Sequence, residues 1–452
     1  MALTWRAPLL VVLGVALVLV WPTAAAVWTW VGVCVALVGL DLTLAPSPRS
    51  LRLARSVPTS VRLGEPLTVE LQVANPGGRR VRGAVRDAWP PSAGIAPTGG
   101  RFGLDLPAGE RRRFTTPLRP SRRGDRLADR VTVRCDGPLG LARRQRSFDV
   151  PARLRVLPPF TSRKHLASRL SRLRELDGRS SVLHRGQGSE FDSLRDYVDG
   201  DDVRSIDWRA TARRQAVVVR TWRPERDRRV LLVVDASRTS AARIGGPSGA
   251  DSVGEGSTAS SGEPPMEVRL DAAIEAALLT AALASRAGDR VALVAHDRRV
   301  RARVRGSGRG NLLPDLVAAL APLQPALVEA DWDAVATEIR TSTRQRALVV
   351  LLTSLDAAAL EGGLLMVLEQ LAARHTVILA AVDDPALDEL AARRDDVEEV
   401  YGAAAAEAAR GERSATAALV RRLGVEVVHA VPEELAPAVA DRYLALKAAG
   451  RL

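Results

Sequence analysis

The sequence predicts an α/β domain with a doubly wound, mostly parallel sheet, preceded by a small β-sandwich-like domain and an N-terminal transmembrane hairpin. Three observations lead to this fold class. Two apolar runs open the chain, short alternating segments with recurrent turn residues follow, and apolar strand candidates alternate with helical stretches in the last part. These changes of pattern divide the chain into residues 1–45, 50–158, 160–226 and 227–452.

Composition narrows the possible functions. The chain has 452 residues, 46% of them hydrophobic, which is enough for two or three packed domains. Its formal net charge is +13, but the arginines are interleaved with acids and not gathered in a stripe, so we expect no nucleic acid as a partner. The two cysteines, Cys34 and Cys135, make no disulfide framework, which suits a reducing compartment.

The N-terminal apolar runs cover residues 7–20 and 24–40, and each is slightly shorter than the about 20 residues of a spanning helix. Basic residues precede and follow them, which favours a hairpin with both ends in the cytoplasm: Arg6, Arg49, Arg52 and Arg55. The alternative is a signal peptide cleaved near residues 24–26, but the second run argues against simple secretion. We therefore expect a plasma-membrane protein with cytoplasmic soluble domains.

The next region has the pattern of a small β domain. Apolar and polar residues alternate from Leu67 to Val73, and a turn is expected at residues 75–78. Further short strands are expected at residues 81–85, 113–118, 131–134 and 147–150. Turns recur about every 10 residues, as in a β-sandwich. The region contains no catalytic set, so a spacer or a protein-contact module is the favoured interpretation.

A helix is expected at residues 162–176, a loop at 178–188, and then a segment rich in acids and arginines. Carboxylates beside guanidiniums form charge-assisted pairs. The favoured interpretation is an ion-pair network that pins this segment against the following domain, and the alternative is a partner-binding or metal-proximal surface. The acids are Glu190, Asp192, Asp196, Asp199, Asp201, Asp202 and Asp207, and the arginines include Arg195, Arg204, Arg209, Arg213, Arg214 and Arg220.

This segment carries a family resemblance. The motifs GSEF from Gly188, LRDY from Leu194 and GDDVRSIDWRATAR from Gly200, with the later Glu225-Arg226, resemble the signature of the bacterial family called domain of unknown function 58. The residues that match this signature most distinctively are Asp201, Asp202, Arg204, Asp207, Trp208 and Arg213.

The resemblance implies a plan for essentially the whole chain. That plan is a membrane hairpin, a β domain, the motif and a von Willebrand factor A-like domain. It also implies a MoxR-type AAA+ ATPase as a partner, because the genes of such ATPases often neighbour those of the family. It implies no particular enzymatic activity.

The residues support the α/β domain independently of the resemblance. Buried strands are expected at residues 230–234, 291–295, 347–352, 376–382 and 425–429, with an edge strand at 300–304. Helices are expected at residues 267–287, 312–320, 332–341, 357–374, 385–393, 404–423 and 432–448. Residues 245–265 are rich in Gly, Ser and Pro and are interpreted as a mobile insertion.

The candidate site follows the first of these strands. Asp235, Ser237 and Thr239 lie where open α/β sheets bind ligands, and their oxygen atoms suit Mg²⁺ or another divalent cation. The resemblance to von Willebrand factor A-like domains implies two further metal-binding loops. In the second, Gly310 stands in place of the expected Thr.

In the third loop, Ser354 replaces the expected Asp, and Asp356 comes two residues later. The sequence therefore predicts a degenerate metal site made of Asp235, Ser237, Thr239 and Asp356. The alternative is a structural role, in which Asp235 caps the following turn.

Other motifs carry little weight. Gly306, Gly308 and Gly310 lack the full dinucleotide-binding spacing, and neither Lys164 nor Lys447 belongs to a P-loop. The five histidines have no metal-ligand spacing, and the sequence has no Gly-x-Ser-x-Gly elbow.

These observations favour a non-enzymatic, membrane-anchored interaction or scaffold protein. Its α/β domain would bind a protein partner at the Asp235 face, where an acidic side chain of the partner completes a metal shell. The alternative function is a metal-dependent hydrolase that uses Asp201, Asp202, Asp207 and Asp235, which requires the two acidic stretches to meet in space.

Overall fold

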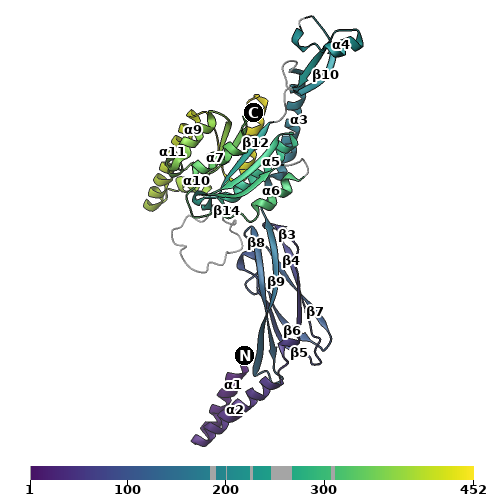
Figure 1. The fold of residues 1–452 in the computed structure, drawn as a ribbon. Helices are drawn as coiled ribbons and strands as arrows, with labels where there is room; N and C mark the ends of the chain where they lie inside the picture. The colour runs from purple at the N-terminus through teal and green to yellow at the C-terminus, as the bar shows by residue number, and fades with distance from the viewer. Residues whose placement is uncertain (1, 184–189, 200, 224–227, 246–266, 307–310) are drawn as a thin grey trace. The chain divides into compact units, whose positions relative to one another are not determined.

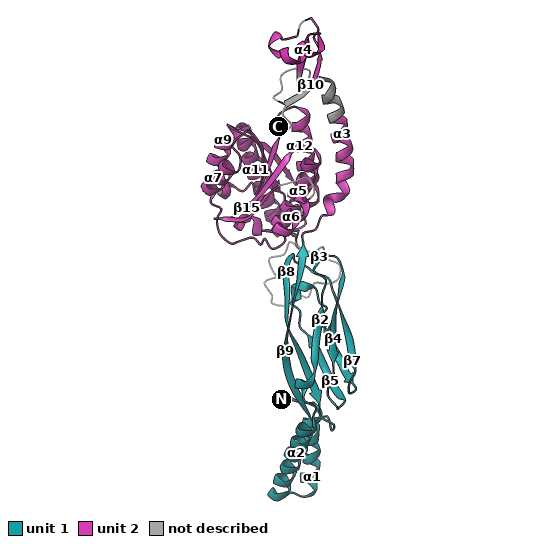
Figure 2. Ribbon diagram, turned by 45° about the vertical axis from the view of Figure 1, so that its right-hand side comes forward, with its two compact units in different colours: residues 1–157 teal, residues 158–452 magenta. Residues whose placement is uncertain are grey.

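The computed structural model divides the chain into two compact units, Met1–Leu157 and Pro158–Leu452 (Figures 1 and 2). The structure describes residues 2–183, 190–199, 201–223, 228–245, 267–306 and 311–452.

Unit 1 opens with two apolar helices, α1 (Arg6–Val20) and α2 (Ala24–Leu44). They are separated at Pro22, and Thr23 caps α2 by accepting a hydrogen bond from the Ala26 amide. The two helices pack together, and the Trp30 indole donates to the Leu10 carbonyl oxygen at 3.3 Å. Among the described residues, one helical segment, Ala24–Ser50, is long and apolar enough to cross a membrane, with a mean hydropathy of 1.9.

The second helix is longer than the apolar run that predicted it, because it continues past Asp41. The Asp41 carboxylate is fully buried in the β domain. It accepts hydrogen bonds from the backbone N–H groups of Leu139, Leu141 and Ala142 at 2.6, 2.7 and 2.8 Å. A charge that looked like the end of the helix thus fastens α2 to a turn of the β domain.

The β domain is built from two sheets around a shared core, as the alternating pattern predicted. One sheet has the order β1-β9-β8-β5-β6, with β3 paired to β9, and the other has the order β2-β4-β7. Val69, Leu71 and Val73 of β4 are buried, while alternate residues face outward. The strands are β1 (Ala2–Leu3), β2 (Arg52–Ser56), β3 (Ser60–Arg62), β4 (Leu67–Ala74), β5 (Val81–Asp87), β6 (Arg101–Leu106), β7 (Arg111–Leu118), β8 (Gly124–Asp136) and β9 (Ala142–Leu157).

Unit 2 contains a six-stranded sheet of order β16-β15-β12-β17-β18-β19 (Figure 1). Neighbouring strands are parallel, except that the edge strand β16 runs antiparallel to β15. The strands are β12 (Arg229–Asp235), β15 (Arg290–His296), β16 (Val300–Arg305), β17 (Leu348–Leu352), β18 (Thr376–Val382) and β19 (Glu426–Ala430).

Helices cover both faces of this sheet. Val230, Leu232 and Val234 of β12 pack with α5, α6 and α12, whereas Leu231 and Val233 pack with α7, α9 and α11. The sheet is therefore doubly wound, and the apolar runs predicted its strands because both of their faces are buried. The helices are α5 (Arg269–Arg286), α6 (Leu312–Leu320), α7 (Trp332–Ser342), α8 (Ala357–Ala359), α9 (Leu365–Ala372), α10 (Pro385–Ala392), α11 (Val397–Arg422) and α12 (Pro432–Ala448).

Two predicted helix boundaries in unit 2 were wrong. The loop expected from residue 178 begins later, because α3 (Leu166–Leu183) continues through Gly178. The helix expected from residue 404 begins at Val397, where Asp396 caps it by accepting from the Glu399 amide. The expected mobile insertion at residues 245–265 lies outside the described residues, apart from Gly245.

The acidic-basic segment forms a small module of its own. Strands β10 (Glu190–Asp196) and β11 (Val218–Arg223) pair antiparallel, and α4 (Trp208–Arg214) lies in the connection between them (Figure 1). Asp207 caps α4 by accepting from the amides of Arg209 and Ala210. The side chains of Val218 and Val219 are buried. We call the described residues 197–199 and 201–217 the hairpin tip.

Candidate functional site

The candidate site begins where the central strand β12 ends. Asp235 is buried, and one carboxylate oxygen accepts from the Ser237 amide at 2.8 Å. The other accepts from the hydroxyls of Thr239 at 2.9 Å and Thr353 at 2.7 Å. The Ser237 and Thr239 hydroxyl oxygens lie 3.2 Å apart. The structure thus gathers Asp235, Ser237 and Thr239 into one carboxylate–hydroxyl cluster, which also includes Thr353.

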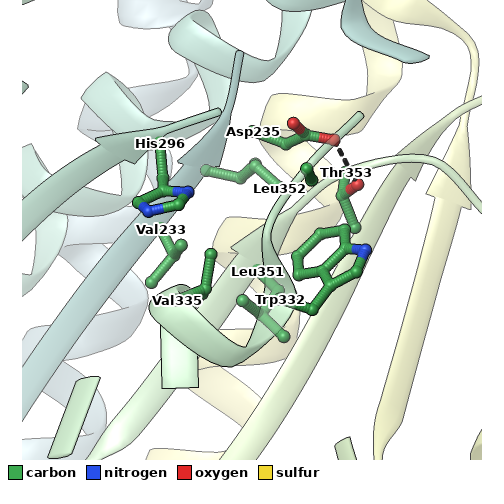
Figure 3. Close-up of a pocket in the computed structure, with 9 residues that line it drawn as sticks. Val233, Asp235, His296, Trp332, Val335, Leu351, Leu352 and Thr353 are labelled. Carbon is green, nitrogen blue, oxygen red and sulfur yellow. Dashed lines mark hydrogen bonds between the residues drawn. The ribbon is translucent and has the colours of Figure 1, made fainter. Parts of the chain in front are cut away.

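Thr353 was not among the predicted site residues. It follows β17 directly, and β17 is the parallel neighbour of β12, so its side chain reaches Asp235 across 118 positions of sequence (Figure 3). The signal that could have found it is its position, because the carboxyl ends of adjacent parallel strands meet at one edge of a sheet.

Asp356, the fourth predicted ligand, has a different partner. Its carboxylate pairs with Arg269, at the start of α5, at 3.0 Å. Asp235, in contrast, is surrounded by neutral donors. Ser354, which stands where the resemblance to von Willebrand factor A-like domains implies an Asp, has a buried hydroxyl with no hydrogen-bond partner in the described part of the chain.

The loop expected to supply the second set of ligands begins at the wrong edge of the sheet. Because β16 runs antiparallel, the chain leaves it at Gly306, whose amide donates to Val291 at the amino end of β15. Gly310 itself lies outside the described residues. The loop that does reach the Asp235 edge is residues 326–331, since the Arg238 amide donates to the Val328 carbonyl at 2.9 Å.

Two hollows adjoin the cluster. The inner one lies behind Asp235 among apolar side chains, with His296 and Trp332 in its wall (Figure 3). The outer one is lined by Ser237, Arg238, Thr239, Glu329, Ala330, Trp332, Ala359 and Gly362. Arg238 and Glu329 form an exposed ion pair at 2.7 Å. The cluster therefore opens onto a polar, charged surface.

His296 is the titratable neighbour of the cluster. It ends β15, is paired in register with Asp235, and is buried. Burial lowers the pKa of His296 because it disfavours the imidazolium, and this outweighs the opposite effect of Asp297, Asp331 and Asp235. The ring is therefore neutral around pH 7, and Asp235 has no cationic partner in it.

The oxygen atoms of the cluster fit a hard cation in part. Adjacent ligands of an octahedral Mg²⁺ ion, each about 2.1 Å from it, are about 3.0 Å apart, close to the separation of the Ser237 and Thr239 hydroxyls. A hydroxyl that donates to Asp235 keeps its lone pairs for a cation. No three His, Cys, Asp or Glu side chains gather at a possible metal position within the described residues. Such an ion would therefore need further ligands from water or a partner.

The carboxylates of the family motif are used within their own module. Arg195 pairs with Asp201 at 2.5 Å, and Arg220 pairs with Asp207 at 2.9 Å. The hydrogen bond from Arg195 lowers the pKa of Asp201. The amide of Ala210, followed by Arg220, lowers that of Asp207. These pairs close the hairpin on itself, so the expectation that they pin it against the following domain was wrong for both.

The other motif residues face outward. Asp202 accepts from the Arg204 amide and begins a short 3₁₀ turn, Val203–Ser205. The side chains of Trp208 and Arg213 are exposed. The hydrolase alternative requires Asp201, Asp202, Asp207 and Asp235 to share one site. In the structure each of these carboxylates is instead bonded to groups of its own segment or sheet edge.

Comparisons with known proteins give a family and little more. Residues 193–248 and 251–409 match the family described as "Protein of unknown function DUF58". A relative from Bacillus subtilis (strain 168), named "Uncharacterized protein YeaD", is 28% identical over 115 residues. That match covers 25% of this chain and 28% of the relative.

Two solved structures illustrate the structural matches. The CARDB domain of a Pyrococcus furiosus protein, in complex with metal ions, is 19% identical, with a TM-score of 0.16, over 22% of this chain and 84% of that chain. A chain from the human seminal plasma complex of Zinc 2-glycoprotein and Prolactin inducible protein is 15% identical, with a TM-score of 0.20, over 24% of this chain and 92% of that chain.

The family match begins at residue 193, so it takes in the hairpin module and most of the α/β region, while the N-terminal helices and the β domain lie outside it. The resemblance implied a domain plan for essentially the whole chain, whereas the family match covers a smaller part of it. The motif that suggested the family runs through Asp201, Asp207 and Trp208, inside the matched residues, and the chain belongs to the DUF58 family.

Proposed function

We propose that this chain is a membrane-anchored interaction protein whose α/β region binds a protein partner at the Asp235 edge of its sheet. One observation carries the proposal. The buried cluster of Asp235, Ser237, Thr239 and Thr353 opens onto the outer hollow, which carries an exposed Arg and Glu. Ligands of doubly wound sheets bind at this edge.

A divalent cation such as Mg²⁺ belongs to this proposal as a bridge. The Ser237 and Thr239 hydroxyls would hold it, with Asp235 behind them supplying negative charge. The cluster has one carboxylate, and Asp356 is engaged by Arg269, so an acidic side chain of the partner would supply the missing charge. This arrangement is the one expected of a von Willebrand factor A-like domain.

The proposed role is not catalytic. Asp235 accepts three hydrogen bonds, which occupy most of the about four lone-pair sites of its carboxylate, so it is poorly placed as a general base. The neighbouring His296 is held neutral in a wall of apolar side chains. Both features suit a rigid recognition surface better than a proton-transfer site.

Membrane anchoring would come from α1 and α2. The apolar part of α2 that precedes Asp41, residues 24–40, extends about 25 Å, which is near the lower limit for a helix that spans a bilayer. Large apolar side chains along both helices are exposed. We propose that both helices form a hairpin, with Arg6, Arg49 and Arg52 at the cytoplasmic surface of the plasma membrane. Arg55 is buried in a pair with Asp87, so it adds no free charge there.

The partner suggested by the family resemblance is a MoxR-type AAA+ ATPase, and co-purification tests it. The full chain would be co-expressed with such an ATPase from the same genome, extracted in detergent and captured. We expect Arg238→Glu and Glu329→Arg to reduce the ATPase recovered about tenfold or more, because each reverses a charge at the rim of the hollow. Arg421→Glu, an exposed change on α11, is the matched control.

The contribution of the cation is tested in the same assay. We expect chelation by EDTA, and the Ser237→Ala and Thr239→Ala variants, to lower recovery, and added Mg²⁺ to restore it only with both hydroxyls present. Recovery that is equal for parent, Arg238→Glu and Glu329→Arg would exclude the Asp235 edge as the binding surface. Recovery unaffected by EDTA would show that the partner binds at this surface without a divalent cation.

A further inference from the structure

The hairpin tip, residues 197–199 and 201–217, exposes apolar side chains in a module whose described backbone is held by hydrogen bonds. Val198, Val203 and Trp208 are 62, 63 and 67% exposed, and Val217 is also exposed. Exposed apolar groups that gather in one short connection mark interaction surfaces more often than scattered ones do. Trp is the residue type most enriched among side chains that dominate binding energy.

The backbone of the tip is fixed before any partner arrives. The Tyr197 amide donates to Val217 at 2.9 Å, the Asp207 amide to Val218 at 2.9 Å, and the Val218 amide to the Thr211 hydroxyl at 3.1 Å. A partner therefore meets a surface that needs little ordering, which lowers the entropic cost of binding. The exposed Trp208 is held at the first turn of a capped helix.

The tip has four aspartates and four arginines, but the charges left without an ion pair are mostly positive. Asp201 and Asp207 are neutralised by Arg195 and Arg220 from the strands. The exposed arginines of the tip have no ion pair among the described residues, and they are Arg204, Arg209, Arg213 and Arg214. Within the tip, Asp199 and Asp202 remain without an ion pair in the described structure, and Asp196 of β10 is a third such aspartate beside it. The four unpaired arginines therefore outnumber the unpaired aspartates near Trp208.

From this arrangement we propose that the hairpin tip is a docking surface for an acidic protein segment that also carries apolar side chains. Trp208, with Val198 and Val203, would take the apolar groups, and the four arginines would take carboxylates in bidentate pairs. The surface is distinct from the Asp235 edge, and the proposal does not depend on the function proposed for that edge.

A protein segment fits the tip better than a nucleic acid or an anionic membrane. Asp199 and Asp202 are exposed among the arginines, so a uniformly charged phosphate surface would meet repulsion that a mixed protein surface avoids. Single-stranded nucleic acids need successive exposed aromatic side chains for stacking, whereas in the tip Trp208 is exposed and Tyr197 is half-buried.

Binding of defined probes to the full chain in zwitterionic nanodiscs tests the proposal. The probes are fluorescent synthetic peptides of equal length: one alternating Glu with Leu and Phe, one with Ser in place of the apolar residues, and one with Lys in place of Glu. Duplex DNA and phosphatidylglycerol vesicles serve as the competing polyanions. We expect the acidic apolar peptide to bind most tightly and the Lys peptide not to bind.

The variants assign the contacts. Trp208→Ala should weaken binding of the acidic apolar peptide about 30-fold, as for a central interface aromatic, and Arg213→Glu about tenfold. Matched controls on α11, Tyr401→Ala and Arg421→Glu, also remove an exposed aromatic and an exposed arginine and should leave binding unchanged. Trp208→Phe should retain most of the affinity, which separates loss of the contact from loss of the fold.

Several results would overturn the proposal. They are equal binding of the Leu/Phe and Ser peptides, binding by Trp208→Ala and Arg213→Glu within about twofold of the parent, or a dependence of DNA or vesicle binding on the same residues. Asp235→Ala and Arg238→Glu should leave peptide binding unchanged. A loss there, with the tip variants unaffected, would instead place the peptide at the Asp235 edge.

Discussion

The carboxylates of the Asp235 edge and of the hairpin module differ in burial and in the kind of group that donates hydrogen bonds to them. Asp235 is buried and satisfied by neutral donors, namely one amide and two hydroxyls. Asp201 and Asp207 lie nearer the surface and are satisfied by guanidiniums as well as amides. Each of these stretches carries aspartates beside hydroxyl or arginine side chains, so residue type alone does not separate their roles.

The difference shows where a charge is costly. A buried carboxylate needs all of its hydrogen bonds, because each lost partner leaves a desolvated group unpaired. When an exposed ion pair is broken, water replaces the lost polar contacts, so the free energy of unfolding changes little. Substitutions at the Asp235 edge should therefore change stability, whereas those in the hairpin module should change binding and leave stability nearly intact.

The largest expected effect is that of Asp235→Ala. It leaves the Ser237 amide and the Thr239 and Thr353 hydroxyls without an acceptor, and we expect a loss of about 2–4 kcal/mol in the stability of the α/β region. Amide hydrogen exchange of β12 and β17 in the full chain measures this locally, which avoids assuming one unfolding transition for two units. Asp235→Asn, which keeps one acceptor oxygen, should lose less.

Thr353→Val removes one of the three hydrogen bonds that the Asp235 carboxylate accepts and leaves the other two in place. We expect a loss of about 1 kcal/mol, the usual net value of one hydrogen bond, measured by the same exchange experiment. Thr353→Ser keeps the hydroxyl and should restore most of the protection of β12. A Val variant as well protected as the parent would mean that Asp235 does not depend on the neighbouring strand.

A smaller effect is expected from pH, through His296. Its folded pKa lies below the ordinary value of 6.5, so the unfolded chain binds the proton more tightly. The stability contribution is complete above about pH 6.5 and is lost as pH falls toward the folded pKa. His296→Gln should reduce the fall in thermal unfolding temperature between about pH 7.5 and pH 5.5. Burial also lowers the pKa of His375, which contributes in the same direction, so His296→Gln should remove only part of the fall. An unchanged fall in His296→Gln would contradict this contribution.

Sequence patterns predicted the α/β sheet well and the β domain less completely. The strands from β12 to β19 that are buried on both faces carry unbroken apolar runs, as in Leu348–Leu352. Strand β6, Arg101–Leu106, was missed because it lies at a sheet edge and mixes charges and Gly with its apolar residues. Strands β8 and β9 are longer than predicted, since their outward residues are mostly charged.

For the site, local residue spacing predicted part of the arrangement, whereas the strand order and direction that complete it could not be predicted from the sequence. The positions of Asp235, Ser237 and Thr239 followed from the end of one strand. The contribution of Thr353 depends on β17 being the parallel neighbour of β12, and the role of residues 326–331 depends on β16 being antiparallel. A short strand such as Val300–Arg305 has the same pattern in either direction, so these contacts were beyond local sequence patterns.

The smallest effect is expected from Asp201→Asn in the hairpin module. Asn keeps an acceptor for the Val198 amide and loses the ion pair with Arg195. That pair is partly exposed to solvent and is therefore screened by salt. We expect unchanged exchange of the amides in β10 and β11, in contrast to Asp235→Asn. A comparable loss of protection at both positions would show that the hairpin carboxylates are structural in the same sense as Asp235, and the contrast between the two regions would then fail.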